Sequence, residues 1–319
     1  MRSLVLLLAL TGCGRFGFDE QRPVDDAAAG TEGVPIDSQV GSDAVARPCT
    51  GAAWCNEMSG VTDDLSAIWG TSATNIWAVG GGGTIVHRDA IGWGRVFSAT
   101  GSNLTAIGGS SSQDVWALGS GGGSHWNGTV WQQRGVPTTP VEDIWMNASD
   151  NGWAVGADMW RWNGSTWAIV STPTSQMLRG VWGVNANDVF AVGDGGVILR
   201  WNGSVWTQMT SNTTRDLNAI DGRGVNDIWA VGNFGVTLHF DGSVWTSVPA
   251  AGTEILYAVA VAGPVDVWAT GDNNNLVHWN GSAWSVAMAG TPRFMQGMWA
   301  NSAQEVWMVG GIGTVQRGP

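Results

Sequence analysis

The stretch LNAIDGRGVNDIWAVGNFGVTLHFDGSVWT, residues 217–246, is one complete copy of a pattern that fills most of the chain. It contains four short segments of alternating apolar and polar residues, 217–220, 227–231, 236–240 and 243–246, separated by turn-forming residues such as Gly, Asn and Asp. Alternation with a period of two is typical of β-strands. Each copy therefore predicts one four-stranded sheet.

The pattern recurs seven times at intervals of 37 or 39 residues, and the seventh copy stops at Pro319 before its fourth strand. That strand is normally marked by Gly-x-x-Trp, and the same spacing occurs at 51–54, just before copy one. Four-stranded repeats that complete one another in a circle indicate a β-propeller. We therefore predict an all-β, seven-bladed propeller over residues 48–319, with four strands per blade and the last blade closed by an N-terminal strand at about residues 51–58. The copies open at Leu65, Leu104, Val141, Leu178, Leu217, Leu256 and Met295.

The aromatic content follows this repeat. Hydrophobic residues make up 44% of the 319 residues, enough for one large domain. Of the 22 Trp, 21 occupy four columns of the repeat. The tryptophans are therefore predicted to be core rather than the lining of a single pocket.

The N-terminus has the features of an export signal. A basic start is followed by an apolar run, Ser3 to Leu10, that is too short to span a bilayer, and then by Leu10-Thr11-Gly12-Cys13. This segment resembles a bacterial lipobox. The resemblance implies a lipoprotein signal peptide at residues 1–12, lipid attachment at Cys13 and anchoring in the outer membrane, since Gly14 rather than Asp follows the cysteine. An ordinary signal peptide is the alternative.

Residues 13–47 are predicted to be the lipidated cysteine and a disordered acidic tether, because they lack Trp and contain seven carboxylates against three Arg. If Cys13 carries the lipid, Cys49 and Cys55 remain as one pair of cysteines in an oxidising compartment. We expect a disulfide between them; two free thiols are the alternative. The net charge is −12, and the chain has no Lys. Such a chain is a poor ligand for nucleic acid or anionic lipid, so we expect membrane contact only through the lipid anchor, and a monomer.

The repeated sequence of the predicted blades resembles a known propeller family. Residues 187–193 (NDVFAVG), followed by residues 201–206 (WNGSVW), resemble Asp-box (BNR-type) propellers, including the photosystem II assembly-factor group, and also tectonin-type lectins. In the Asp-box family these residues build the turn between strands three and four, away from the ligand face, so the resemblance implies a fold and not an activity. The leading Ser or Thr of the box is replaced here by Trp201 and Trp279.

Several residue columns invite a metal-site interpretation. All four histidines lie at the same position of the predicted third strand, each in a different copy. Equivalent positions on different blades are separated by sheets packed about 10 Å apart, whereas each ligand atom of a zinc site lies about 2 Å from the metal. These histidines therefore cannot bind one metal ion together. We expect no metal and no cofactor, and instead a repeated hydrogen bond to Asp114, Asp188, Asp227 or Asp266. The run Asp272 to Asn275 offers oxygen ligands for calcium, with a solvated loop as the alternative. The column holds His87, His125, His239 and His278, with Arg161, Arg200 and Gln316 in the other copies.

The residue after each opening apolar residue is a different polar side chain in every copy, a variety that packing does not require. If this column lines the mouth of the central channel, it forms an asymmetric polar ring suited to a ligand. The alternative is a solvent-facing position where any polar residue is tolerated. The column is Ser66, Thr105, Glu142, Arg179, Asn218, Tyr257 and Gln296. The predicted ligand-binding residues are Glu142, Arg179, Asn218 and Tyr257, joined by Asp194, Phe234, Asp272 and Arg293 from loops expected on the same face.

Two classes of function fit these features. The first is a non-catalytic surface recognition module that binds a glycan or an envelope or extracellular protein through the inter-blade loops. The second is an Asp-box-type glycoside hydrolase or lyase, which would need a carboxylate pair such as Glu142 and Asp143. Sialidases of that fold also use an arginine triad and a tyrosine, and Tyr257 is the single tyrosine here. We therefore expect no catalytic residues, and an assembly or structural role in the cell envelope is the third hypothesis.

Overall fold

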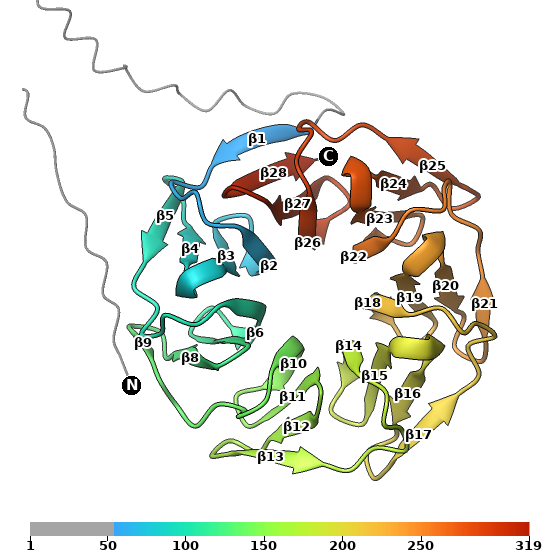
Figure 1. The fold of residues 1–319 in the computed structure, drawn as a ribbon, viewed down its shortest axis with the longest axis horizontal. Helices are drawn as coiled ribbons and strands as arrows, with labels where there is room; N and C mark the ends of the chain where they lie inside the picture. Colours follow the sequence, from blue (N-terminus) through green and yellow to red (C-terminus); the bar gives the residue numbers. More distant parts are fainter. Residues whose placement is uncertain (1–53, 319) are drawn as a thin grey trace, which may run out of the picture. The chain divides into compact units, whose positions relative to one another are not determined.

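A computed structural model of the protein, described here over residues 54–318, shows seven four-stranded antiparallel sheets arranged as a ring (Figure 1). The prediction of a seven-bladed propeller is confirmed. The predicted signal peptide, Cys13, the tether and Cys49 lie outside the described residues, so the pairing of Cys49 with Cys55 stays a prediction. Within residues 54–318 there is no helix with the length and apolar character needed to span a bilayer.

The first three blades follow the chain in order, each from the innermost strand to the outermost. Blade one is β2 (Leu65–Ser72), β3 (Asn75–Gly80), β4 (Ile85–Arg88) and β5 (Trp93–Val96), with a 3-10 turn η1 (Gly81–Gly83) between β3 and β4. Blade two is β6 (Leu104–Ser111), β7 (Asp114–Gly119), β8 (Gly122–Trp126) and β9 (Trp131–Gln132). Blade three is β10 (Val141–Ala148), β11 (Asn151–Gly156), β12 (Met159–Trp162) and β13 (Trp167–Val170).

Blades four to six, like blade one, contain a 3-10 turn between their second and third strands. Blade four is β14 (Leu178–Asn185), β15 (Asp188–Gly193), η2 (Asp194–Gly196), β16 (Ile198–Trp201) and β17 (Trp206–Met209). Blade five is β18 (Leu217–Gly224), β19 (Asp227–Gly232), η3 (Asn233–Gly235), β20 (Thr237–Phe240) and β21 (Trp245–Ser247). Blade six is β22 (Leu256–Gly263), β23 (Asp266–Gly271), η4 (Asp272–Asn274), β24 (Leu276–Trp279) and β25 (Trp284–Ala287).

Blade seven is completed by the N-terminal strand, as predicted. Its strands are β26 (Met295–Ser302), β27 (Glu305–Gly310), β28 (Thr314–Gly318) and β1 (Cys55–Met58), hydrogen-bonded in the order β1-β28-β27-β26. Cys55 pairs with Arg317 and Met58 with Thr314, in antiparallel register. The two ends of the described chain therefore lie in one sheet, at the point where β1 meets β28 in Figure 1.

The inner strands are longer than the sequence pattern predicted. In blade five the pattern predicted a strand at residues 217–220, whereas β18 extends from Leu217 to Gly224. The register shifts by one residue between Leu217 and Ala219, and again between Gly222 and Gly224. Each such bulge breaks the alternation of side chains between the two faces of the sheet. The apolar and polar alternation in the sequence therefore ends before the last residue of the strand, so the predicted strand was too short.

One aromatic contact recurs at every junction between blades. The Trp that opens or immediately precedes the fourth strand packs against the Trp or Phe of the second strand in the preceding blade, at a large interplanar angle. Ring centroids lie 5.0–6.4 Å apart and interplanar angles run from 69° to 89°. Aromatic pairs favour such edge-to-face geometry. The seven pairs are Trp131–Trp77, Trp167–Trp116, Trp206–Trp153, Trp245–Phe190, Trp284–Trp229, Trp54–Trp268 and Trp93–Trp307.

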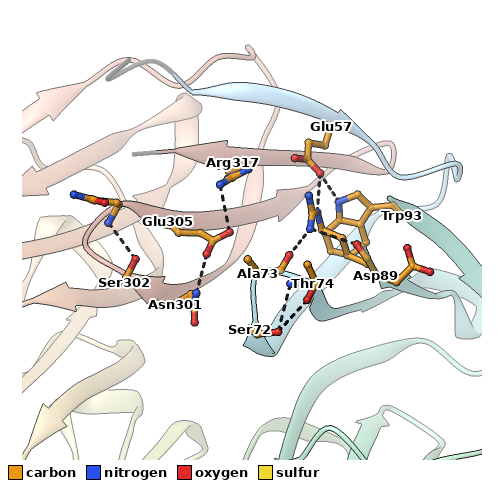
Figure 2. Close-up of polar contacts among 12 residues, drawn as sticks. Glu57, Ser72, Ala73, Thr74, Asp89, Trp93, Asn301, Ser302, Glu305 and Arg317 are labelled. Atoms are coloured by element: carbon orange, nitrogen blue, oxygen red, sulfur yellow. Dashed lines mark hydrogen bonds and ion pairs between the residues drawn. The ribbon is translucent and has the colours of Figure 1, made fainter. Parts of the chain in front are cut away.

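The closing strand is also tied to blade one by polar contacts, shown in Figure 2. The carboxylate of Glu57 accepts hydrogen bonds from the indole Nε1 of Trp93 at 2.9 Å and from Nε of Arg88 at 3.2 Å. The guanidinium of Arg88 also donates to the carbonyl of Ala73. Glu57 lies on the outermost strand of blade seven, so these bonds fasten the junction where the ring closes.

Asn-Gly and Asp-Gly pairs lie in the connections between the third and fourth strands of blades two to six. In blade two, the Asn127 side-chain oxygen accepts from the backbone N–H groups of Thr129 and Val130, at 3.0 Å each. Gly128 has φ +92°, whereas Asn127 is not in the left-handed region. The connection is therefore a four-residue turn stabilised by the Asn side chain, and not a two-residue hairpin with both residues at positive φ.

Trp54 provides a direct test of ring closure. Its side chain is 8% exposed and lies against Trp268, and its ring fills the space where a side chain at Gly318 would be. Trp54→Ala is expected to lower the free energy of unfolding by about 3–5 kcal/mol, the usual range for a buried aromatic truncation. Chemical denaturation of the full chain measures it.

Met58 on the same strand is the matched control, because its side chain is 82% exposed. Met58→Ala should change the free energy of unfolding by no more than about 0.5 kcal/mol. Equal effects of the two substitutions would contradict the closing role of Trp54.

Candidate functional site

The inner strands enclose a central cavity of about 390 Å³. All seven members of the polar column line it, which agrees with the first of the two interpretations that the sequence left open. The ligand-binding role assigned to Glu142, Arg179, Asn218 and Tyr257 stays a prediction. The lining residues of the column are Ser66, Thr105, Glu142, Arg179, Asn218, Tyr257 and Gln296.

Four side chains of the ring already have partners in the fold. The guanidinium of Arg179 donates from Nε to Asp194, and the hydroxyl of Tyr257 donates to Asp272 at 2.9 Å. Asn218 donates to the carbonyl of Leu256 in the next blade at 2.8 Å and to Asn233 at 3.0 Å. Thr105 donates to the carbonyl of Val141, also in the next blade.

The remaining three side chains of the ring keep their hydrogen-bonding capacity. Within residues 54–318, the side chains of Ser66, Glu142 and Gln296 make no hydrogen bond or ion pair. All three side chains line the central cavity. The groups best placed to contact a ligand are therefore Glu142, Ser66 and Gln296, together with the terminal nitrogens of Arg179.

The predicted loop residues divide between the cavity rim and more distant places. Asp194 and Asp272 belong to the turns η2 and η4 and hold Arg179 and Tyr257 from outside the cavity. Phe234 is exposed at the tip of η3. Arg293 lines a separate groove of about 500 Å³ beside the ring-closing strand, with Ile312 and Val61. Arg293 is therefore not part of the central site, although it was predicted with it.

The cavity wall contains two buried carboxylates: Asp143, which the sequence suggested as a partner of Glu142 in a catalytic pair, and Asp221, to which the sequence assigned no role. Asp143 accepts from the backbone N–H of Ile144 at 2.8 Å and of Val181, in blade four, at 2.9 Å. Asp221 accepts from the N–H of Val261, in blade six, at 2.7 Å. Burial raises the pKa of each carboxyl to about 7, and these backbone donors oppose that shift only partly. Both groups link neighbouring blades at the cavity.

The deep part of the cavity is shaped by pairs of large and small residues. The ring of Trp145 lies where a side chain on Gly183 of the next blade would be, 2.7 Å from an added Cβ, and Trp69 blocks Gly109 in the same way at 2.8 Å. Where a blade has no Trp here, the next blade carries a larger residue than Gly. The Trp–Gly pairs are Trp69–Gly109, Trp145–Gly183, Trp182–Gly222 and Trp299–Gly70; the other three are Gly108–Met146, Asp221–Val261 and Ala260–Ala300.

The histidine column forms the predicted polar pairs at the opposite end of the blades. His125 pairs with Asp114 at 2.6 Å, His239 with Asp227 at 3.1 Å, and His278 with Asp266 at 2.6 Å. Arg200 makes two bonds to Asp188, at 2.8 and 3.0 Å. Among residues 54–318, no group of three or more His, Cys, Asp or Glu is arranged to hold a metal ion.

One member of this column was placed wrongly from the sequence. In blade seven the residue opposite the second-strand Trp is Arg317, which pairs with Trp307, and not Gln316. A terminal nitrogen of Arg317 lies 3.6 Å from a carboxylate oxygen of Glu305, and Figure 2 shows this ion pair as a dashed line. Gln316 is fully buried instead, and its side-chain amide is hydrogen-bonded to the side-chain amide of Asn56 at 2.8 Å. Counting seven residues on from Gly310, as in the other full-length turns, gives Arg317.

Comparisons with known proteins agree on the architecture. No family model and no curated protein matches the chain. Among solved structures, YCF48 bound to D1 peptide superposes with a TM-score of 0.67 at 16% identity, over 83% of this chain and 96% of that one. The WD40 propeller domain of Doa1 gives 0.67 at 12% identity over 82% and 96%, and U3-55K gives 0.70 at 10% identity over 84% and 98%. At these identities the likeness shows the fold, a seven-bladed β-propeller.

The size matching in the cavity floor can be tested by a thermodynamic cycle. Gly183→Ala is expected to destabilise the protein by about 1–3 kcal/mol, because the added Cβ would lie 2.7 Å from the ring of Trp145. In a Trp145→Ala background the same substitution should be neutral or stabilising, since it recreates the Ala260–Ala300 combination of blades six and seven. Denaturant unfolding of the four proteins gives the coupling. Equal effects in both backgrounds would show that the two residues are independent.

The buried carboxylates predict an unusual pH dependence. The pKa of Asp221 is about 7 in the fold, against about 3.9 for an unfolded chain. Between these values the folded state binds a proton that the unfolded state has lost, so the free energy of unfolding falls as pH rises from about 4 to about 7. Asp221→Asn removes this carboxyl and with it this contribution to the pH dependence of the free energy of unfolding. The melting temperature of the variant minus that of the wild type should therefore increase over this range and level off above it; a constant or falling difference would contradict the raised pKa.

Proposed function

We propose that this propeller is a non-catalytic recognition module that binds a protein segment through its loop face, over the central cavity and Phe234. The observation that carries the proposal is the conformation and exposure of Phe234. The central cavity supplies further polar groups, the side chains of Ser66, Glu142 and Gln296, that have no hydrogen-bond partner within residues 54–318.

Phe234 occupies a position where the fold favours a different residue. It has φ +59° and ψ +34°, in the left-handed region, where the equivalent residues of η1 and η2 are Gly82 and Gly195. For a residue with a bulky side chain this conformation is unfavourable by roughly 1–2 kcal/mol. The side chain is nevertheless 59% exposed, so the strain is not offset by burial. A surface aromatic held in this way is typical of a contact residue.

Two further features extend the contact surface. The guanidinium of Arg215 lies over the Phe234 ring, 4.2 Å from its centroid. At the tip of the corresponding turn in blade seven, Ile312 has φ +54° and is 56% exposed. Aromatic residues and Arg are enriched among the residues that dominate binding energy at protein interfaces. The loop face therefore presents separate apolar and cationic contacts around a polar cavity.

The free groups of the cavity suit the polar atoms of a peptide. Glu142 supplies an acceptor, while Ser66 and Gln296 supply both donors and acceptors. An extended segment crossing the cavity mouth would expose backbone N–H and C=O groups that need such partners. The structural neighbour YCF48 has been solved with D1 peptide, which supports a peptide over a sugar as the ligand class.

The other functional hypotheses rest on weaker support. A glycosidase pair of Glu142 and Asp143 is disfavoured because both oxygens of Asp143 already accept backbone N–H groups. Glycan binding and an assembly role remain hypotheses without a residue that favours them. Display from the outer membrane through lipid at Cys13 belongs to this proposal and rests on the sequence alone.

The proposal is tested by selecting peptides from a random display library on the immobilised protein and measuring their affinities by calorimetry. Phe234→Asn, which copies Asn273 at the same turn position with φ +53°, should weaken binding at least about tenfold while leaving the melting temperature unchanged or higher. Glu142→Gln should weaken it as well. Val205→Asn, at a 52% exposed hairpin position on the opposite face, is the control and should have no effect.

A glycan array with the same variants separates the alternatives. Sugar binding that Phe234→Asn abolishes, in the absence of any selected peptide, would overturn the peptide proposal. Peptide binding that is equal in all variants would place the interaction elsewhere on the ring.

A further inference from the structure

At the hairpin end of the blades a pair of polar side chains recurs at the same two positions in all seven copies, so the blades can be compared with one another. In one blade the two side chains do not bond to each other. In six blades the His or Arg of the third strand reaches an oxygen of the residue that opens the second strand. The second strand of blade three opens with Asn151, and Arg161 stands opposite the second-strand Trp153. Within residues 54–318 the Arg161 side chain has no hydrogen bond and no carboxylate partner. The six complete pairs are His87–Asn75, His125–Asp114, Arg200–Asp188, His239–Asp227, His278–Asp266 and Arg317–Glu305.

The guanidinium of Arg161 is held in place without a counter-ion. It lies over the ring of Trp153 at 5.1 Å and over the ring of Trp201, from blade four, at 5.4 Å. Arg200 stacks in the same way on Phe190 and Phe240. Contact with two aromatic rings orients the planar cation and shields its faces from water, so its N–H edge is left to bind.

Arg161 lines a pocket at this end of the blade. Arg161 and Asn151 line a space of about 560 Å³, together with Asn147, Asp150, Asn163 and neighbouring residues. The side-chain oxygen of Asn151 is buried and has no hydrogen-bond partner. This oxygen is an acceptor, so a carboxylate cannot bond to it; its lack of a partner shows that Arg161 and Asn151 do not bond to each other, and only the NH2 group of the Asn151 amide is able to donate to a carboxylate.

We propose that Arg161 and Asn151 form a binding site for a carboxylate supplied from outside the described chain. The Arg200–Asp188 pair in the next blade shows the geometry that such a ligand would complete, with one carboxylate accepting from Nε and from a terminal nitrogen. The Asn151 amide provides a further donor beside it. A carboxylate fits better than a phosphate or sulfate, because the Asp150 carboxylate also lines the pocket and repels a dianion more strongly.

The site is independent of the proposed peptide-binding face. Arg161 lies near the hairpin end of β12, and Asn151 opens β11 at the same end, whereas the cavity mouth and η3 lie at the opposite end of the blades. Loss of one binding activity therefore leaves the other measurable. The carboxylate belongs either to a small acid or to an acidic side chain of another protein, and the probes below distinguish these sources.

The test follows the Arg Nε–Hε signals of the full chain by NMR during titration with sodium acetate, at an ionic strength held constant with sodium chloride. We expect the Arg161 signal to shift and saturate. Asn151→Asp supplies the missing carboxylate from within the chain and should weaken acetate binding at least about tenfold. Asn75→Asp is the matched control at the equivalent position of blade one, where the partner is His87, and should leave the titration unchanged.

A second readout is thermal. Acetate should raise the melting temperature of the wild type and of Asn75→Asp, but not of Arg161→Gln or Asn151→Asp. A blocked peptide with one Asp, compared with the same peptide carrying Asn, identifies the source: tighter binding of the Asp peptide than of acetate indicates a protein ligand, and equal binding indicates a small acid.

Three results would overturn the proposal. The first is wild-type acetate affinity in Asn151→Asp. The second is a shift of the Arg161 signal that chloride alone reproduces. The third is sulfate binding at Arg161 as tight as acetate binding, which would contradict the carboxylate class.

Discussion

The edge-to-face contact between aromatic rings of adjacent blades is the interaction on which the ring depends. Each blade places the Trp at the start of its outer strand against the second strand of the blade before it, so no sheet buries its aromatic residues alone. Such a chain of contacts leaves one aromatic face uncovered unless it closes. Trp54 supplies the last contact, on Trp268, from the other end of the sequence. Closure is therefore a consequence of the packing between blades, and the Glu57 contacts with blade one add polar bonds at the same junction.

The inner strands obey a second constraint, because seven of them converge on one axis. Deep in the cavity a Trp on one blade requires Gly on the next, as Trp145 requires Gly183. At the second position of the inner strands no such pairing of large and small residues is found, and the side chains there include Ser66, Glu142 and Tyr257. Chemical variety is concentrated where packing permits it, which is why the cavity mouth is a better candidate for recognition than the aromatic core.

Much of this architecture could be predicted from the sequence, because repetition turns single residues into columns. The count of blades, the closing strand and the pairing of His with Asp all follow from spacing. The remainder depends on geometry that spacing does not contain. Arg317 was missed because the final copy was aligned one residue short at its Gly-Ile-Gly turn. The roles of Asp143 and Asp221 were missed because they occupy different positions of their strands and so form no column. The strain at Phe234 appears only in the backbone angles.

Departures from the repeat indicate where something other than packing determines the residue. In a repeat protein each unit experiences nearly the same environment, so the majority residue at a column reports what the fold requires. Asn151 departs from the Asp of four sister blades, and its consequence is an arginine that stacks normally but lacks its partner. At the other end, Phe234 stands where three other turns have Gly or Asn, and its consequence is a strained, exposed aromatic. Neither change improves the stability of the ring by itself. Both leave a group whose interactions are incomplete within the chain, and a ligand that completes them gives each departure a physical reason.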